Sequence, residues 1–248
     1  MLRGNASISS LAQSAATINQ YSQETIEFND VVCFQMTMEM RNQAREAVLP
    51  PALHPTIPAS LSLQVWEVGS SIWGQFTMAV CRIACRSGVR ARGFTSRVYV
   101  SSESVAEKLA TTFGFPASVA ELSFRHSYDG ADIHVIRDGE KILSVASLNP
   151  EPMGLNDVQY TGTLSLAHTP NGLRLVQLEA QHSCSRVERL SSRLVTFVPE
   201  AWGNALFDPY TVVSSSIANQ SVSFPPVRFV CKPDELAFTG TEAVKIDQ

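Results

Sequence analysis

Four side chains in the middle of this sequence are of types that could carry out chemistry on a small molecule. His134 is expected on a strand between two hairpin turns, where its imidazole could act as a general acid or base because it titrates near neutral pH. Glu121 could supply a carboxylate. Arg97 and Tyr99 are two residues apart, so on a strand they share a face, and the guanidinium could clamp a carboxylate through two hydrogen bonds. Three of them have plainer alternatives: His134 as a solvent-facing histidine, Glu121 as a solvated charge, and Arg97 in an ion pair on the outer surface.

Other motifs in the sequence are weaker. His182 and Cys184 also share strand parity, but no third partner is evident, so a Cys/His nucleophile pair is not favoured. The five cysteines contain no Cys-x-x-Cys pair and no two histidines have metal-ligand spacing, so no metal site is expected. A Gly-rich phosphate loop and a Gly-x-Ser-x-Gly elbow are also absent from the sequence, which argues against the reactions that depend on them.

The scaffold for these residues is predicted to be mainly antiparallel sheet. Asp129-Gly130, Asp138-Gly139 and Asn171-Gly172 lie between strand-like runs and favour tight hairpin turns in which two residues take positive φ. Residues 61–68 alternate apolar and polar side chains with period two, as a half-buried strand does. The fold class is therefore mainly β (α+β), with a few short helices.

Two helices are expected. Ser104 and Glu107 have the spacing of a capping box before an apolar stripe, and Pro116 is expected to stop that helix. A second helix is expected over residues 39–48, before Pro50-Pro51. Residues 1–28 are interpreted as a polar N-terminal arm, loosely ordered or in contact with another subunit, with an organellar transit peptide as the alternative. Residues 29–248 form the single domain.

The composition is typical of a compact globular protein. Hydrophobic residues make up 44% and charged residues 17% of the 248 residues, and the formal net charge is -4. This charge offers no basic field for nucleic acid or an anionic membrane, and no apolar run reaches the roughly 20 residues of a spanning helix. The odd number of cysteines favours reduced thiols in the cytoplasm. The locally basic run from Arg82 to Arg97 is interpreted as solvating strand edges.

Several segments, in order along the chain, resemble the acetoacetate decarboxylase family. Gly114-Phe115-Pro116-Ala117-Ser118 resembles its active-site loop, in which a helix ends in an aromatic-Pro-Lys-Lys run. Val48-Leu49-Pro50-Pro51 resembles its Val-Pro-Glu-Pro turn. The remaining similar segments, which bring the set to roughly residues 30–232, are 75–80, Tyr99-Val100, Leu206-Phe207-Asp208-Pro209 and 212–216. The resemblance implies an antiparallel, cone-like closed β-barrel with surrounding sheet.

The resemblance also implies a site that lacks its main catalytic group. One loop lysine of the family forms a Schiff base with the β-keto acid, but Ala117 and Ser118 stand at the two lysine positions of this chain. Gln75 stands where the family has a glutamate, and an amide hydrogen-bonds but does not titrate. Phe115 would form an apolar wall of the pocket. Gln75 and Ser118 would approach one another across that pocket.

These features favour an enzyme that needs neither a Schiff-base lysine nor a cofactor. It would bind a polyketide-like or β-keto small molecule in an apolar barrel and stabilise an enolate or a cyclisation transition state through Gln75 and Ser118. Cyclisation, dehydration and isomerisation suit such a pocket. A non-catalytic binding protein is the first alternative, and a decarboxylase that uses a different residue is the second. The resemblance implies a homo-oligomer, and neither nucleic acid nor a membrane is expected as a partner.

Overall fold

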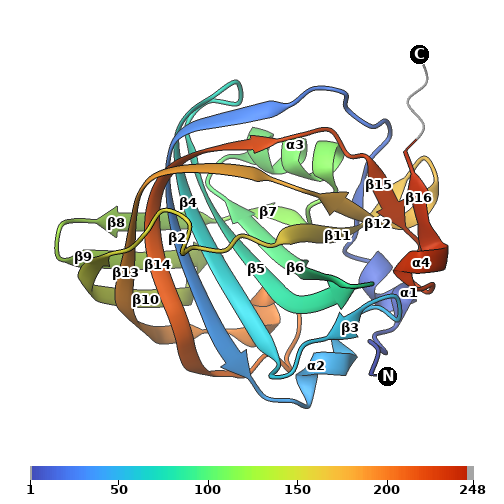
Figure 1. Ribbon diagram of the computed structural model, residues 1–248, viewed down its shortest axis with the longest axis horizontal. Coiled ribbons are helices and arrows are strands. Elements are labelled where there is room, and N and C mark those ends of the chain that lie inside the picture. Colours follow the sequence, from blue (N-terminus) through green and yellow to red (C-terminus); the bar gives the residue numbers. More distant parts are fainter. Residues whose placement is uncertain (1, 245–248) are drawn as a thin grey trace.

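A sixteen-stranded sheet dominates the computed structural model, which describes residues 2–244 (Figure 1). Its hydrogen-bonded order is β16-β15-β12-β11-β6-β5-β4-β2-β14-β13-β10-β9-β8, with β1 beside β11, β3 beside β5 and β7 beside β6. The strands are β1 (Ala16–Thr17), β2 (Ile26–Met40), β3 (His54–Pro55), β4 (Ser60–Ser71), β5 (Phe76–Ser87), β6 (Arg90–Val100), β7 (Ala117–Val119), β8 (Glu121–His126), β9 (Gly130–Arg137), β10 (Glu140–Pro152), β11 (Gly162–Thr169), β12 (Gly172–Leu178), β13 (Gln181–Phe197), β14 (Pro209–Phe224), β15 (Phe229–Cys231) and β16 (Thr241–Ala243).

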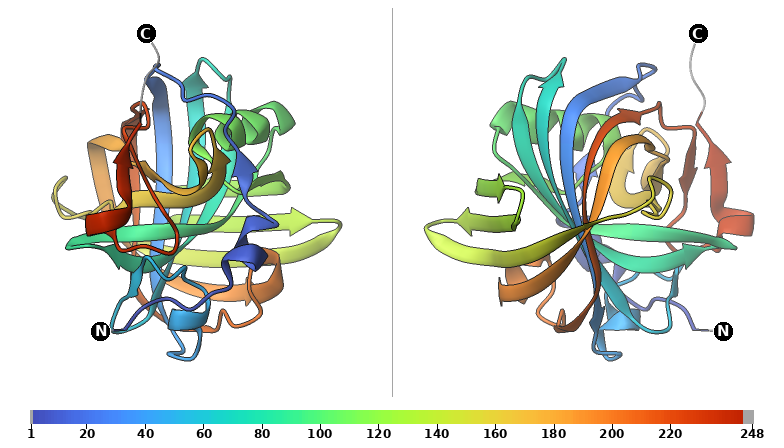
Figure 2. Two further views of the ribbon diagram at one scale, coloured as in Figure 1. Left: turned by 90° about the vertical axis from the view of Figure 1, so that its right-hand side faces the viewer. Right: turned by 60° about the vertical axis from the view of Figure 1, so that its left-hand side comes forward.

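The mainly β fold class is therefore confirmed. Most strand pairs are antiparallel, and the parallel exceptions join β1 to β11, β11 to β6 and β6 to β7. The long strands twist and curve, so that strands at the two sides of the sheet cross at steep angles (Figure 2). Within residues 2–244 no ladder joins β16 to β8, so closure of the sheet into a barrel stays a prediction.

Five short helices complete the described chain: α1 (Ile8–Ala12), α2 (Ala44–Ala47), α3 (Glu103–Phe113), the 3-10 helix η1 (Pro199–Trp202) and α4 (Ala237–Gly240). The helix expected over residues 39–48 is largely wrong, because β2 continues to Met40. Glu39 pairs with Ser60 on one side and Thr211 on the other, so two strand neighbours outweigh the local helical pattern.

The helix expected before the Gly114–Ser118 loop is confirmed as α3. Its side chains Val105 and Leu109 are fully buried. The helix ends at Gly114 rather than at Pro116, because Gly114 takes the left-handed conformation with φ 70°. Its N–H donates to the carbonyl of Ala110, which satisfies one of the last free carbonyls of the helix.

The predicted hairpin turns form, with one difference in their geometry. Asp138 and Gly139 have φ of 53° and 79°, as a tight turn with two positive φ angles requires. At the other two sites only Gly172 has positive φ, at 91°, and Gly130 already belongs to β9. The alternation seen over residues 61–68 is confirmed as β4.

The two faces of the sheet pack against different elements. On β4, Trp66 and Val68 belong to an apolar cluster that includes the buried side of α3, and we call this side the α3 face. Leu63 and Val65 belong to a second cluster that includes Trp202 of η1, and we call this side the η1 face. Figure 1 shows α3 on the concave side of the curved strands. Buried side chains of the central strands such as β4 therefore point to one of two separate interiors.

The N-terminal arm packs against the rest of the chain and is not loose. The N–H of Gly4 donates to the carbonyl of Leu53, at 2.9 Å, and β1 pairs with β11. Ile18 is 1% exposed. The boundary at residue 28 between an arm and a domain stays a prediction.

All five cysteines are free thiols in the structure. No helix within the described chain combines the length and apolar character needed to cross a membrane.

Candidate functional site in the interior of the sheet

The loop that resembles an active site packs into a block of aromatic rings on the α3 face. Phe115 is 2% exposed, and its ring centroid lies 6.4 Å from that of Phe113 and 6.2 Å from that of Phe224. Phe224 also contacts Phe28 and Trp66, edge to face. Phe115 is therefore part of a packed apolar cluster, and its role as the wall of a pocket stays a prediction.

Ala117 and Ser118 lie on opposite faces of the sheet. β7 pairs in parallel with β6, so that Ala117 is level with Val98 and Ser118 is level with Tyr99. Ala117 packs against the α3-face cluster, whereas Tyr99 belongs to the η1-face cluster. Successive strand residues alternate in direction, so the two positions cannot both face one pocket.

Gln75 does not approach Ser118. It is exposed in the turn between β4 and β5, immediately before Phe76. The ladder places Val80 level with Val98, and Val98 level with Ala117, so the side chain of β5 nearest the loop is apolar. The expected convergence is therefore wrong, because the β4–β5 turn carries Gln75 beyond the sheet interior.

The other predicted residues are dispersed over the η1 face and the outer strands. Tyr99 is fully buried, and its hydroxyl donates to the carbonyl of Ala201 at 2.5 Å, which fastens η1 to β6. Arg97 is half-buried on the same face. Glu121 is exposed at the start of β8. His134 is half-buried on β9, on the side opposite to the buried Ile133 and Val135. None of the four belongs to the apolar cluster against which Ala117 packs.

A different group of polar side chains meets on the α3 face. Arg82 on β5 pairs with Thr95 on β6 and with Ser62 on β4, and Ser62 pairs with Thr37 on β2. Arg82 is only 7% exposed. The interpretation that it solvates a strand edge is wrong, because Arg82 follows the buried Met78 and Val80 at even spacing and so points into the same interior.

Six side chains of this interior hold buried polar atoms that have no hydrogen-bond partner within residues 2–244. They define what we call the Arg82 site: Gln64 (Oε1), Trp66 (Nε1), Arg82 (Nε), Thr95 (Oγ1), Ser165 (Oγ) and Gln220 (Nε2). Buried polar groups are almost always paired, so a group of six on one face needs an explanation. Three of these atoms are N–H donors, and two more are hydroxyls that can donate.

Within this group, burial of the charged Arg82 side chain costs the most free energy. No ion pair in the described part of the chain includes it. Burial lowers the pKa of its guanidinium to about 10, and the nearby thiols of Cys33 and Cys81 oppose this shift. The group remains a cation at neutral pH, and a buried cation without a counter-charge is destabilising. The arrangement is suited to an anionic ligand.

A second set of contacts lies beside Trp66. The imidazole of His182 stacks on the ring of Tyr160, with centroids 3.7 Å apart and planes 6° apart, and lies edge-on to Trp66 at 5.9 Å. His182 Nδ1 is 3.1 Å from Gln220 Oε1. Because an amide oxygen only accepts, Nδ1 carries the proton and Nε2 keeps its lone pair when the ring is neutral. Cys184 Sγ also reaches Gln220 Oε1, at 3.6 Å.

Burial keeps this second set neutral. It lowers the pKa of His182 to about 4, although the hydrogen bond that Nδ1 donates to Gln220 Oε1 works in the opposite direction. It raises the pKa of the Cys33 thiol to about 12 and raises the pKa of the Tyr160 hydroxyl as well. At neutral pH Arg82 is therefore the charged group among neutral donors and acceptors. The sequence showed the shared parity of His182 and Cys184, but not Tyr160 and Gln220, which come from distant segments.

Comparison with known proteins places the fold. No family model matches the sequence, and no curated protein matches it. Among solved structures, acetoacetate decarboxylase from Legionella pneumophila is similar, with a TM-score of 0.71 and 16% identity over 84% of this chain and 88% of that chain. The chain has the acetoacetate decarboxylase fold.

Two further solved structures agree with this assignment. The enduracididine biosynthesis enzyme MppR complexed with pyruvate has a TM-score of 0.67 and 13% identity, over 82% of this chain and 89% of that chain. An acetoacetate decarboxylase-like enzyme from Sphingomonas wittichii RW1 has a TM-score of 0.61 and 16% identity, over 83% and 92%. Solved proteins that share the acetoacetate decarboxylase fold are thus described as enzymes.

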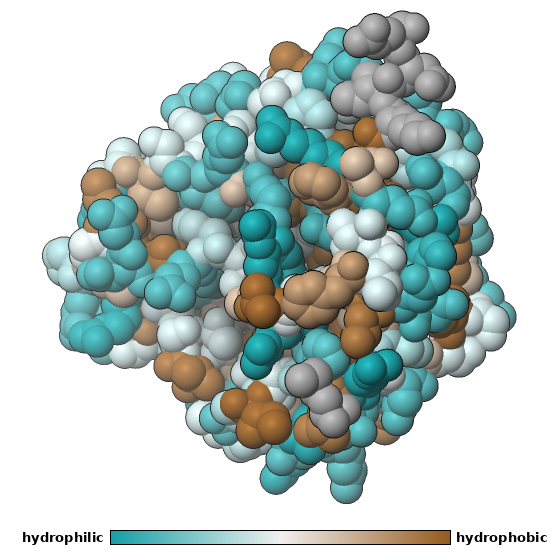
Figure 3. All heavy atoms as spheres, turned by 45° about the vertical axis from the view of Figure 1, so that its right-hand side comes forward, coloured by the Kyte–Doolittle hydropathy of each residue, from teal (hydrophilic) through white to brown (hydrophobic). Residues whose placement is uncertain are grey.

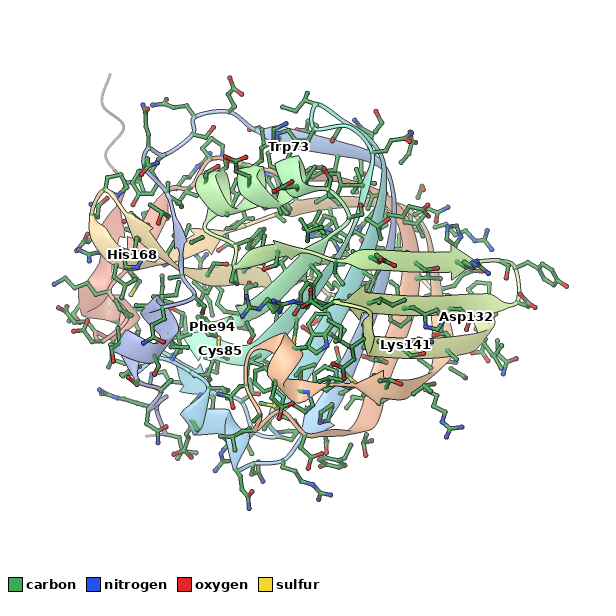
Figure 4. The ribbon with its side chains drawn as sticks, turned by 180° about the vertical axis from the view of Figure 1, so that it is seen from behind. Trp73, Cys85, Phe94, Asp132, Lys141 and His168 are labelled. Atoms are coloured by element: carbon green, nitrogen blue, oxygen red, sulfur yellow. The ribbon has the colours of Figure 1, made fainter. Side chains whose placement is uncertain are left out.

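Within the acetoacetate decarboxylase fold of this chain, none of the lysines in the described residues belongs to the Arg82 site. Lys108 and Lys141 are exposed, and Lys232 pairs with Glu235 at 2.6 Å. Figure 4 shows Lys141 on the β9–β10 part of the sheet, across the molecule from His168. Lys245 lies outside the described residues. Residues 2–244 also contain no group of three or more His, Cys, Asp and Glu side chains that could hold a metal ion.

Proposed function

We propose that the chain is an enzyme that acts on a β-keto or polyketide-like carboxylate in the Arg82 site, without a Schiff-base lysine and without a cofactor. The observation that carries the proposal is the buried, unpaired guanidinium of Arg82 among donors that have no partner. Such a site selects an anion, and it stabilises negative charge that moves from a carboxylate to an enolate oxygen. The reaction class is cyclisation, dehydration or isomerisation.

The chemistry follows from the charges of the site. Removal of a proton beside a carbonyl group leaves an enolate, and donors fixed in a dry interior stabilise that charge more strongly than water does. Arg82, Trp66 Nε1 and Gln220 Nε2 can supply such donors. The lone pair of His182 Nε2 is an acceptor for the proton, and a pKa of about 4 keeps it available at pH 7.

A non-catalytic binding protein is the second candidate function. The aromatic packing beside Phe115 favours it, since the space next to the loop is occupied by side chains. Both candidates need an anion at Arg82, and they differ in whether the bound molecule reacts.

The test is exchange of deuterium into the methylene group of acetoacetate, followed by NMR, which reports enolate formation. We expect the wild-type chain to accelerate exchange above buffer, and Arg82→Met to reduce the rate at least tenfold. Arg82→Met should keep or raise the melting temperature, because replacing a buried unpaired charge with an apolar side chain is neutral or stabilising. Arg86→Met, which removes an exposed arginine from the same strand, is the matched control.

The other possible results of this experiment either favour the binding protein or reject the Arg82 site. Binding of acetoacetate that depends on Arg82 but gives no exchange would support the binding protein and reject the enzyme. Equal exchange by wild type and Arg82→Met would reject the Arg82 site. Borohydride treatment with acetoacetate should leave the protein mass unchanged, and an adduct on any lysine would contradict lysine independence.

A further inference from the structure

A cavity on the η1 face contains a second arginine without a partner. It has a volume of about 50 Å³ and lies between α1, β6 and η1. Arg97 lines it together with Ser96 and Asn204, and Leu11, Leu166 and Phe207 form much of its apolar wall. We propose that this cavity binds a small carboxylate anion with a short alkyl group. The site is independent of the proposed function.

The sheet itself directs Arg97 into the cavity. On β6, Tyr99 and Arg97 pair with Ala79 and Cys81, but Thr95 pairs with Arg82, so Ser96 is an extra residue. A bulge of this kind turns two successive side chains to one side. The hydroxyl of Ser96 accordingly donates to the carbonyl of Trp202 in η1, at 2.7 Å, on the same face as Arg97.

The guanidinium of Arg97 is without a fixed partner in the described residues. Its Nε is buried and makes no hydrogen bond, and no ion pair there includes it. An acidic ligand would supply both the counter-charge and the acceptor. Asn204 can contribute a donor, because its Oδ1 already accepts the N–H of Leu206 at 2.9 Å and leaves the amide nitrogen free.

The size and polarity of the cavity select the ligand. One planar guanidinium and one amide suit the two oxygens of a carboxylate, while a phosphate carries more charge than a single arginine balances. The apolar side chains of the wall suit a methyl or ethyl group. A volume of about 50 Å³ excludes a large substrate.

The N-terminal arm covers this cavity. Leu11, Ser14 and Ala15 contribute to its lining, and Figure 4 shows Phe94, another lining residue, beside α1. A ligand in the cavity would therefore stabilise the docked arm. Thr95 borders both this cavity and the Arg82 site, but Arg97 and Arg82 point to opposite faces of the sheet, so the two arginines can be altered separately.

The experiment uses sodium acetate as the probe and sodium chloride at equal ionic strength as the control. We expect acetate to raise the melting temperature of the wild-type chain and to show saturable binding by calorimetry. Arg97→Met should weaken acetate binding at least tenfold. Arg82→Met should bind acetate at this site like wild type, which separates this proposal from the proposed function.

A second variant keeps the test decisive if Arg97→Met folds poorly. Asn204→Asp keeps the acceptor for the N–H of Leu206 and places a negative charge in the cavity, so it should also weaken acetate binding at least tenfold while the protein remains folded. Acetate binding that is absent from wild type, or that is unchanged in either variant, overturns the proposal.

Discussion

At the scale of single residues, the candidate functional groups found in the structure differ from those predicted from the sequence. The loop residues Phe115 and Ala117 pack into the aromatic interior, and Gln75 is in solvent. Arg82, which looked like a surface charge, is buried without a counter-charge. Burial of this charge lowers the free energy of unfolding of the fold, as is common where a site is organised to bind a charged ligand.

The titration of His182 gives a prediction at this scale. Its pKa is lowered to about 4 in the folded chain, so between that value and the unfolded value near 6.5 the unfolded chain binds more protons. Stability contributed by neutral His182 is therefore present above the unfolded pKa and is lost as the pH falls from about 6.5 towards 4. We expect a loss of about 2 kcal/mol between pH 7 and pH 5.

Urea denaturation at pH 7 and pH 5 measures this loss. His182→Asn cannot titrate, so its stability should fall less between the two pH values, and the difference between the two chains isolates the imidazole. An identical fall in wild type and His182→Asn would show that other groups cause the pH dependence.

At the scale of elements, the end of α3 sets the geometry of the loop. Gly114 has φ of 70°, and a Cβ at this position would lie 2.7 Å from the Cβ of Ala167 and 3.3 Å from Ile18. The glycine thus allows both the left-handed turn and the close approach of β11 and the N-terminal arm. Gly139 has a similar φ of 79° but open space around it.

These two glycines form a matched pair for mutation. Gly139→Ala should cost about 1–2 kcal/mol, which is the usual strain of a left-handed alanine. Gly114→Ala should cost more, by about 1–3 kcal/mol, because the packing around the new methyl group must also move. Thermal or urea denaturation of the two variants measures the difference. Equal costs would show that the interior beside α3 yields easily to added volume.

At the scale of the whole molecule, one surface carries unusually exposed apolar side chains. Ile57, Val89 and Phe238 are 73%, 78% and 81% exposed, and all three line one groove beside α4. Figure 3 shows apolar side chains among polar ones on this side of the molecule. Exposed apolar patches are commonly contact surfaces, and the expectation of a homo-oligomer stays a proposal.

We expect light scattering to give at least twice the chain mass of 27.1 kDa. Phe238→Ser should shift the population towards the monomer, because it removes the most exposed apolar side chain of the patch. Tyr128→Ser removes an aromatic side chain that is 91% exposed, outside this groove, and should leave the mass unchanged. A monomer at micromolar concentration in the wild type would refute the oligomer.

The sequence by itself determined the mainly β fold class, the strand over residues 61–68 and the helix before the loop. Period-two alternation and turn residues act over a few neighbours, so they can be read locally, as the Asp138-Gly139 turn and β4 illustrate. The early helix failed because Glu39 is held by partners 21 and 172 positions away, at Ser60 and Thr211.

Only the tertiary structure decided which side chains meet. A shift of one residue moves a strand side chain to the other face, so the bulge at Ser96 places Thr95 rather than Ser96 beside Arg82. Tyr160, His182 and Gln220 come from three segments, the loop before β11 and the strands β13 and β14, that meet only in the folded chain. Burial then sets the chemistry, because the same arginine is a solvated charge at a strand edge and an anion site within the fold.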